Sequence, residues 1–240
     1  MEVIIFSLLP AIVYAFIIYL STPYRAVSFI AGLSYWSIGF LSVIFVYGFH
    51  HLVPSLLKTI FPPPMGLFFL AFVQIALVEE LSKYLSFRIL NISRTENDTA
   101  IAVMFYAMMT AAGFAVIENY FYAESYGKTV LFYRSFSSVI LHMICGLIMG
   151  YFIARGRENT DVQQYTVFEI FLKRKPKWRK TIYTTLGILA ATAVHGIFDY
   201  LIMLDPKKAE NKILIMIIAG LWVSYLMGRK LSKNYVVKEE

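Results

Sequence analysis

Seven long apolar segments constrain the fold of this 240-residue chain more than any other feature. They cover residues 3–20, 26–49, 65–90, 99–122, 130–154, 181–204 and 213–227. Most are near the ~20 residues that a helix needs to cross the hydrocarbon core of a bilayer. Only helices satisfy the backbone hydrogen bonds of such segments within lipid. The sequence therefore predicts an all-α fold, a polytopic membrane helix bundle of about seven transmembrane helices that forms one integral domain over residues 1–240.

Composition and charge support a membrane location. The chain is 59% hydrophobic and 15% charged, where soluble domains carry about 25% charged residues. Fifteen of its 22 Lys and Arg residues flank the segments on one side, six (Arg134 among them) flank the other, and Lys83 lies within a segment. Because cytoplasmic loops collect Lys and Arg, the N-terminus is expected outside and the C-terminus in the cytoplasm. The net charge of +7 thus reflects the topology of the chain in the cell membrane. We expect the lipid bilayer as a partner and no binding of nucleic acid.

Four consecutive apolar segments carry polar residues at membrane depth. These are Glu79, Glu80 and Lys83 in 65–90, Glu118 and Asn119 in 99–122, His142 in 130–154, and His195 and Asp199 in 181–204. A charged group costs several kcal/mol in hydrocarbon, so such residues usually pair or serve a function. We therefore expect one shared polar site, in which polar atoms of Glu79, His142 and His195 lie within about 8 Å of one another.

Residue spacing suggests pairs within this site. Glu79 and Lys83 are four residues apart, as are His195 and Asp199, so each pair shares a helix face. Asp199 is expected to orient the His195 ring. Glu80 lies about 100° around the helix from Glu79, and either glutamate can serve as the partner of Lys83. Which of the two glutamates is a catalytic base stays open.

Histidines together with carboxylates indicate hydrolysis by activated water. One arrangement is a Zn²⁺ ion with Glu79, Glu118, His142 and His195 as candidate ligands and a water in the open position. The alternative is activation of water by a glutamate without metal. In both, Glu80 and Asp199 belong to the catalytic group, and Lys83 and Asn119 support it.

The order of these residues resembles the motifs of a known family. Glu79-Glu80-Leu81-Ser82-Lys83 is similar to the EExxK motif of the PrsW intramembrane proteases, and Phe114 to Glu118 to their FxxxE motif. His142 and the His195-x-x-x-Asp199 element resemble the two later histidine motifs. The resemblance implies an intramembrane metalloprotease related to the membrane CAAX-prenyl endopeptidases. It further implies a membrane-anchored protein as substrate, such as an anti-sigma factor that receives its first cut near the outer face.

Two other functions remain open at this point. The wider group includes non-catalytic membrane scaffolds of the same fold. Intramembrane carboxylates also form proton or ion relays in transporters, although the sequence has neither an inverted repeat nor a pair of broken helices.

Overall fold

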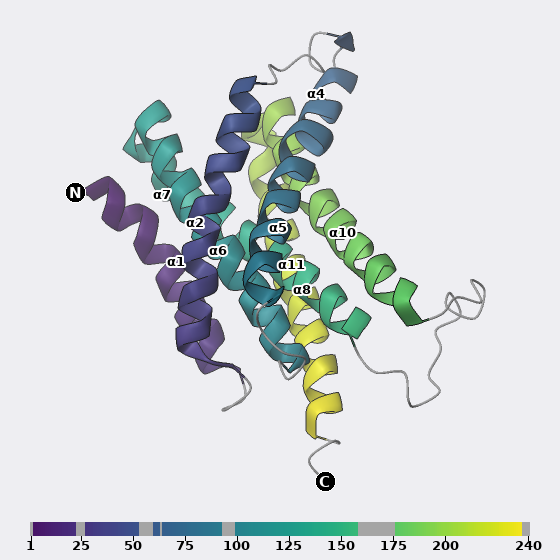
Figure 1. Cartoon of the computed structure of the whole chain (residues 1–240). Coiled ribbons are helices and arrows are strands. Elements are labelled where there is room, and N and C mark those ends of the chain that lie inside the picture. Colours follow the sequence, from purple (N-terminus) through teal and green to yellow (C-terminus); the bar gives the residue numbers. More distant parts are fainter. Residues whose placement is uncertain are drawn as a thin grey trace.

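The structure, a computed structural model, describes residues 2–22, 27–52, 60–62, 64–92, 99–157 and 176–236. These residues form helices and no strand, which confirms the all-α prediction. The helices are α1 (Glu2–Leu20), α2 (Phe29–Leu52), α4 (Met65–Phe69), the π-helical η1 (Leu70–Leu77), α5 (Val78–Ile92), α6 (Ala100–Tyr126), α7 (Lys128–Phe136), α8 (Ser138–Arg157), α10 (Pro176–Leu204) and α11 (Pro206–Val236). Figure 1 shows them gathered into one bundle.

The described part of the chain contains seven spans that are long and apolar enough to cross a membrane, which confirms the expected number. Two of these spans are composite. Met65–Leu90 combines α4, η1 and most of α5, and Lys128–Arg157 combines α7 and α8. The seven spans are 19 to 30 residues long, which is enough to cross the hydrocarbon core of a bilayer.

Two of the differences between the spans and the apolar segments that predicted them have a local cause. The segment expected at 130–154 begins at Lys128 and is interrupted at Ser137, whose amide bonds to Arg134 O. The last helix begins at Pro206 instead of residue 213, because proline suits a first helical turn and the Asp205 side chain accepts a hydrogen bond from Lys208 N (3.3 Å). The prediction placed the start too late because it relied on apolar residues, whereas this first turn contains charged ones.

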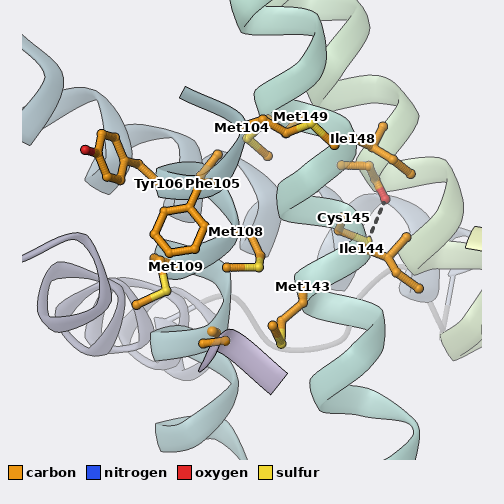
Figure 2. Close-up of a cluster of buried hydrophobic side chains, with 14 of the residues drawn as sticks. Met104, Phe105, Tyr106, Met108, Met109, Met143, Ile144, Cys145, Ile148 and Met149 are labelled. Carbon is orange, nitrogen blue, oxygen red and sulfur yellow. Dashed lines mark hydrogen bonds between the residues drawn. The ribbon is translucent and has the colours of Figure 1, made fainter. Parts of the chain in front are cut away.

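The centre of the bundle is α6, which is largely buried between α2 and α8. Small residues allow this close packing. A Cβ atom added at Gly113 would lie 2.0 Å from Trp36 O, and one at Gly39 would lie 2.2 Å from Thr110 O. Methionine and aliphatic side chains lie between α6 and α8 (Figure 2). Cys145 Sγ of α8 donates a hydrogen bond to Ala191 O on α10 (3.6 Å).

The π-helical turns of η1 stand directly before the two central glutamates. π-Helical turns within a longer helix are frequent at functional sites. One widened turn is supported from α2, since His50 Nε2 lies 3.0 Å from Gln74 O. On the other side the Phe72 ring packs against Gly196 of α10, where an added Cβ would come within 2.5 Å of the ring. The contact of Phe72 with Gly196 holds η1 against α10, next to His195.

The close contact between α2 and α6 predicts a stability difference between two glycines of α2. Gly39→Ala should lower the free energy of unfolding by about 1–3 kcal/mol, because the new methyl group meets backbone atoms that cannot rotate away. Gly48→Ala is the matched control, since nothing lies within 4 Å of its Cβ position. Thermal unfolding in detergent should separate the two, and equal midpoints would contradict this packing.

Candidate functional site

The polar residues of α5, α6, α8 and α10 meet inside the bundle. Glu79, Glu80, Lys83, His142 and His195 are each at most 4% exposed. Glu118 and Asp199 are less enclosed, with side chains 15% and 17% exposed. Ligand atoms of Glu79, His142 and His195 all lie within 4.8 Å of one another, which confirms the expected convergence of these three groups.

Lys83 connects both glutamates of α5 to a histidine of α8. Its Nζ donates to Glu80 Oε1 (2.8 Å) and lies 3.5 Å from Glu79 Oε2. The same Nζ lies 2.8 Å from His142 Nδ1. Lys83 can reach both carboxylates because residues three and four positions apart are neighbours on the surface of a helix. Glu80 is therefore the closer partner of Lys83, a question that spacing alone had left open.

Each histidine has a carboxylate on one ring nitrogen. Because the Lys83 ammonium has only donors, His142 Nδ1 accepts, and its Nε2–H then donates to Glu118 Oε2 (2.8 Å). On α10, His195 Nδ1 faces Glu80 Oε1 (2.9 Å). A carboxylate behind an imidazole fixes its tautomer and aims the other nitrogen at the site.

The second nitrogen of His195 faces two further carboxylates. Its Nε2 lies 3.7 Å from Glu79 Oε2 and 3.4 Å from Asp199 Oδ2. The expected pairing of His195 with Asp199 is thus present at salt-bridge distance, while Glu80 makes the shorter contact to the ring. The His142 and His195 rings stand perpendicular, with centroids 5.0 Å apart.

The donor set fits a metal ion. Two imidazoles and a carboxylate are the protein ligands of many catalytic zinc sites. Four carboxylates (Glu79, Glu80, Glu118 and Asp199) face two cations (Lys83 and Arg134) in this cluster, which leaves a formal excess of two negative charges for a divalent ion. Glu80 Oε2 and Asp199 Oδ2 are buried and accept no hydrogen bond from the described residues. His142 Nδ1, however, faces Lys83, so ligation through this atom requires the ammonium to move.

Glu118 and Asn119 lie at the edge of the site, on α6. Glu118 Oε2 receives His142 Nε2–H, and it lies outside the close group that Glu79, His142 and His195 form. Asn119 is fully buried, and its Oδ1 accepts a hydrogen bond from Arg134 Nε (2.8 Å). Direct ligation by Glu118 stays a prediction, while its contact with the His142 ring is part of the geometry.

Sequence reasoning missed Arg134. It counted this residue with the charges outside the membrane, whereas the structure places its guanidinium against Glu118 and Asn119. The signal was available, because Arg134 lies inside the predicted segment 130–154, as Lys83 lies inside 65–90. The argument that a charged residue within an apolar segment pairs or serves a function was applied to Lys83, and it applies to Arg134 as well.

Comparison with known proteins places the chain in a family. The model of the "PrsW family intramembrane metalloprotease" matches residues 22–226. Protease PrsW of Oceanobacillus iheyensis is 29% identical over 69% of this chain and 68% of the relative, and Protease PrsW of Clostridioides difficile is 25% identical over 92% and 87%. Protease PrsW of Bacillus subtilis is 26% identical over 57% of this chain and 56% of the relative.

No solved structure gives a significant match. The family match covers the four helices that carry the glutamates and histidines, and it includes six of the seven membrane spans in full or nearly so. The chain is a multi-pass membrane protein that belongs to the PrsW family of intramembrane metalloproteases.

Proposed function

We propose that this protein hydrolyses a peptide bond of a membrane-anchored protein, with Glu79 as the residue that activates water. The observation that carries the proposal is the buried group in which a Glu79 oxygen and one nitrogen each of His142 and His195 lie within 4.8 Å. Glu79 suits the role of base better than Glu80. Glu80 Oε1 is held by Lys83 and His195 at 2.8 and 2.9 Å, whereas the contacts of Glu79 Oε2 are 3.5 and 3.7 Å.

The reaction uses these groups in order. Glu79 takes a proton from water, the water oxygen bonds to the scissile carbonyl carbon, and the same proton passes to the nitrogen as the C–N bond breaks. Lys83 stabilises the negative charge that Glu79 carries before the proton transfer. Glu80 and Glu118 keep the His195 and His142 rings in fixed orientations.

Zn²⁺ is the metal we propose, and His142, His195 and one carboxylate oxygen of Glu79 would hold it. The second oxygen of Glu79 would remain free to take the proton from water. When bound, the ion would supply a polarised water and a Lewis acid for the scissile carbonyl. The support is chemical: both histidines have a carboxylate on one ring nitrogen, as metal-binding histidines usually do. Asp199 stands beside His195 Nε2 as a further oxygen donor or a second orienting group.

The substrate class follows from the depth and orientation of the site. Glu118 precedes the end of α6 at Tyr126 by about 12 Å of helix. With the N-terminus outside and the C-terminus in the cytoplasm, this end faces outward. The cut would then fall within the membrane, toward the outer face of the cell membrane. Since the family resemblance implies it, we propose a single-span anti-sigma factor as substrate.

Loss of one carboxylate tests the catalytic role of Glu79. Glu79→Gln keeps the shape of the side chain and removes its basicity, so cleavage should fall at least about 100-fold. The assay uses purified protein in liposomes with single-span membrane proteins of the source organism, anti-sigma factors first. Glu124→Gln, an exposed residue of α6, is the control and should cleave normally. Wild-type cleavage by Glu79→Gln would exclude Glu79 as the base.

Elemental analysis tests the metal. Detergent-purified protein should contain roughly one zinc ion per chain, and His142→Ala and His195→Ala should each lower this content, because each removes one of the proposed ligands. His50→Ala should keep the metal, since His50 contacts Gln74 O and not the site. Full activity in protein that contains no metal would instead favour direct activation of water by Glu79.

Thiol labelling tests the orientation. In a Cys145→Ala background, Lys207→Cys should react with a membrane-impermeant maleimide on intact cells, because the proposed topology puts the start of α11 outside. Arg229→Cys, near the other end of the same helix, should react only after lysis. The opposite pattern would reverse the proposed topology and move the cleavage to the cytoplasmic side.

A further inference from the structure

Arg134 is the second cation of the buried cluster, and no role proposed above uses it. Its side chain is 14% exposed and makes three hydrogen bonds. Nη2 donates to Glu118 Oε2 (2.5 Å) and to Ser138 Oγ (2.8 Å), and Nε donates to Asn119 Oδ1 (2.8 Å). The guanidinium also lies over the Tyr122 ring, with Cζ 3.7 Å from its centroid. Four residues from two other helices thus surround one side chain.

The local chain directs Arg134 inward. α7 is a short helix between Gly127, whose φ of +86° suits glycine, and the break at Ser137. This short helix packs against α1, α6 and α8. Lys128, at the start of the same helix, has a different environment, since it is 67% exposed and pairs with Glu2. Position on α7, and not charge alone, therefore determines which cation reaches the site.

Arg134 acts on the site through Glu118. Glu118 Oε2 receives hydrogen bonds from both Arg134 and His142, so the position of this oxygen is set by both. A buried carboxylate that loses its charged partner is strongly destabilised and rearranges or takes up a proton. Either change would release His142 Nε2–H and free the ring whose Nδ1 points at Lys83.

The guanidinium is suited to this task in a way that an ammonium is not. Its planar fork reaches three oxygen atoms on α6 and α8 at once and stacks on an aromatic ring. An ammonium is a compact charge with no stacking face. The geometry therefore requires arginine at this position, and lysine would keep the charge while losing the fixed orientation.

We propose that Arg134 is a positioning residue for proteolysis: it fixes Glu118, and Glu118 in turn fixes the orientation and tautomer of His142. The chain of contacts runs from Arg134 to Glu118 Oε2, to His142, and through Lys83 to Glu79 and Glu80. This inference rests on the proposed hydrolysis at Glu79. It assigns the control of the His142 ring to α7, a helix outside the four that carry the catalytic group.

Kinetics with purified protein in liposomes tests the proposal. Arg134→Ala should lower kcat by about 10–100-fold, the usual effect of losing the partner that orients a histidine, with KM little changed. Added guanidinium should restore part of the activity of Arg134→Ala and should not affect wild type. Arg134→Lys should fold and still lose activity, which covers the case in which the alanine variant does not fold. Lys128→Ala is the matched control on the same helix and should retain full kcat.

A spectroscopic measurement separates this proposal from the proposed function. In protein labelled with ¹⁵N-histidine, wild type should show His142 as the Nε2–H tautomer, and Arg134→Lys should shift or broaden the His142 signals while leaving those of His50 in place. Wild-type kcat together with unchanged His142 signals would overturn the role of Arg134 and leave the proteolysis intact. Absence of cleavage by wild type would overturn the proteolysis, and the His142 signals would still decide whether Arg134 holds that ring.

Discussion

The buried ion pair of Lys83 with Glu79 and Glu80 is the interaction on which the rest of the site depends. Lys83 lies one helical turn beyond both glutamates on α5, and all three groups are at most 4% exposed. Isolated charges are too costly at this depth, so each must find partners on neighbouring helices. The requirement draws His142 from α8 and His195 from α10 toward α5, and it explains why polar residues of four helices form one cluster.

The surrounding fold serves to hold this cluster at fixed positions. α6 lies at the centre because Gly39 and Gly113 allow α2 to approach its backbone closely. η1 precedes the glutamates and is locked against α10 by the contact of Phe72 with Gly196, next to His195. The site is thus built on packed helices and not on loops, which suits groups that must keep their geometry while peptide bonds are broken.

The number of spans and most members of the buried polar cluster could be predicted from the sequence, because apolar length and intramembrane charge are local signals. Contacts that depend on tertiary packing could not. The closer contact of Glu80 to Lys83 and His195, the π-helical turns of η1, and the break at Ser137 depend on neighbouring helices. Arg134 was missed for a different reason, since its charge was assigned to a loop although its position lay inside a predicted span.

A double-mutant cycle on the cleavage rate tests the central claim, that these groups work as one unit. The cycle compares Glu79→Gln, His195→Ala and the double variant against wild type. When two residues act as a unit, the first substitution already removes most of the rate acceleration that the pair provides. The double variant should therefore be about as slow as the slower single variant. Losses that multiply, as they do for independent sites, would show that Glu79 and His195 do not share one catalytic site.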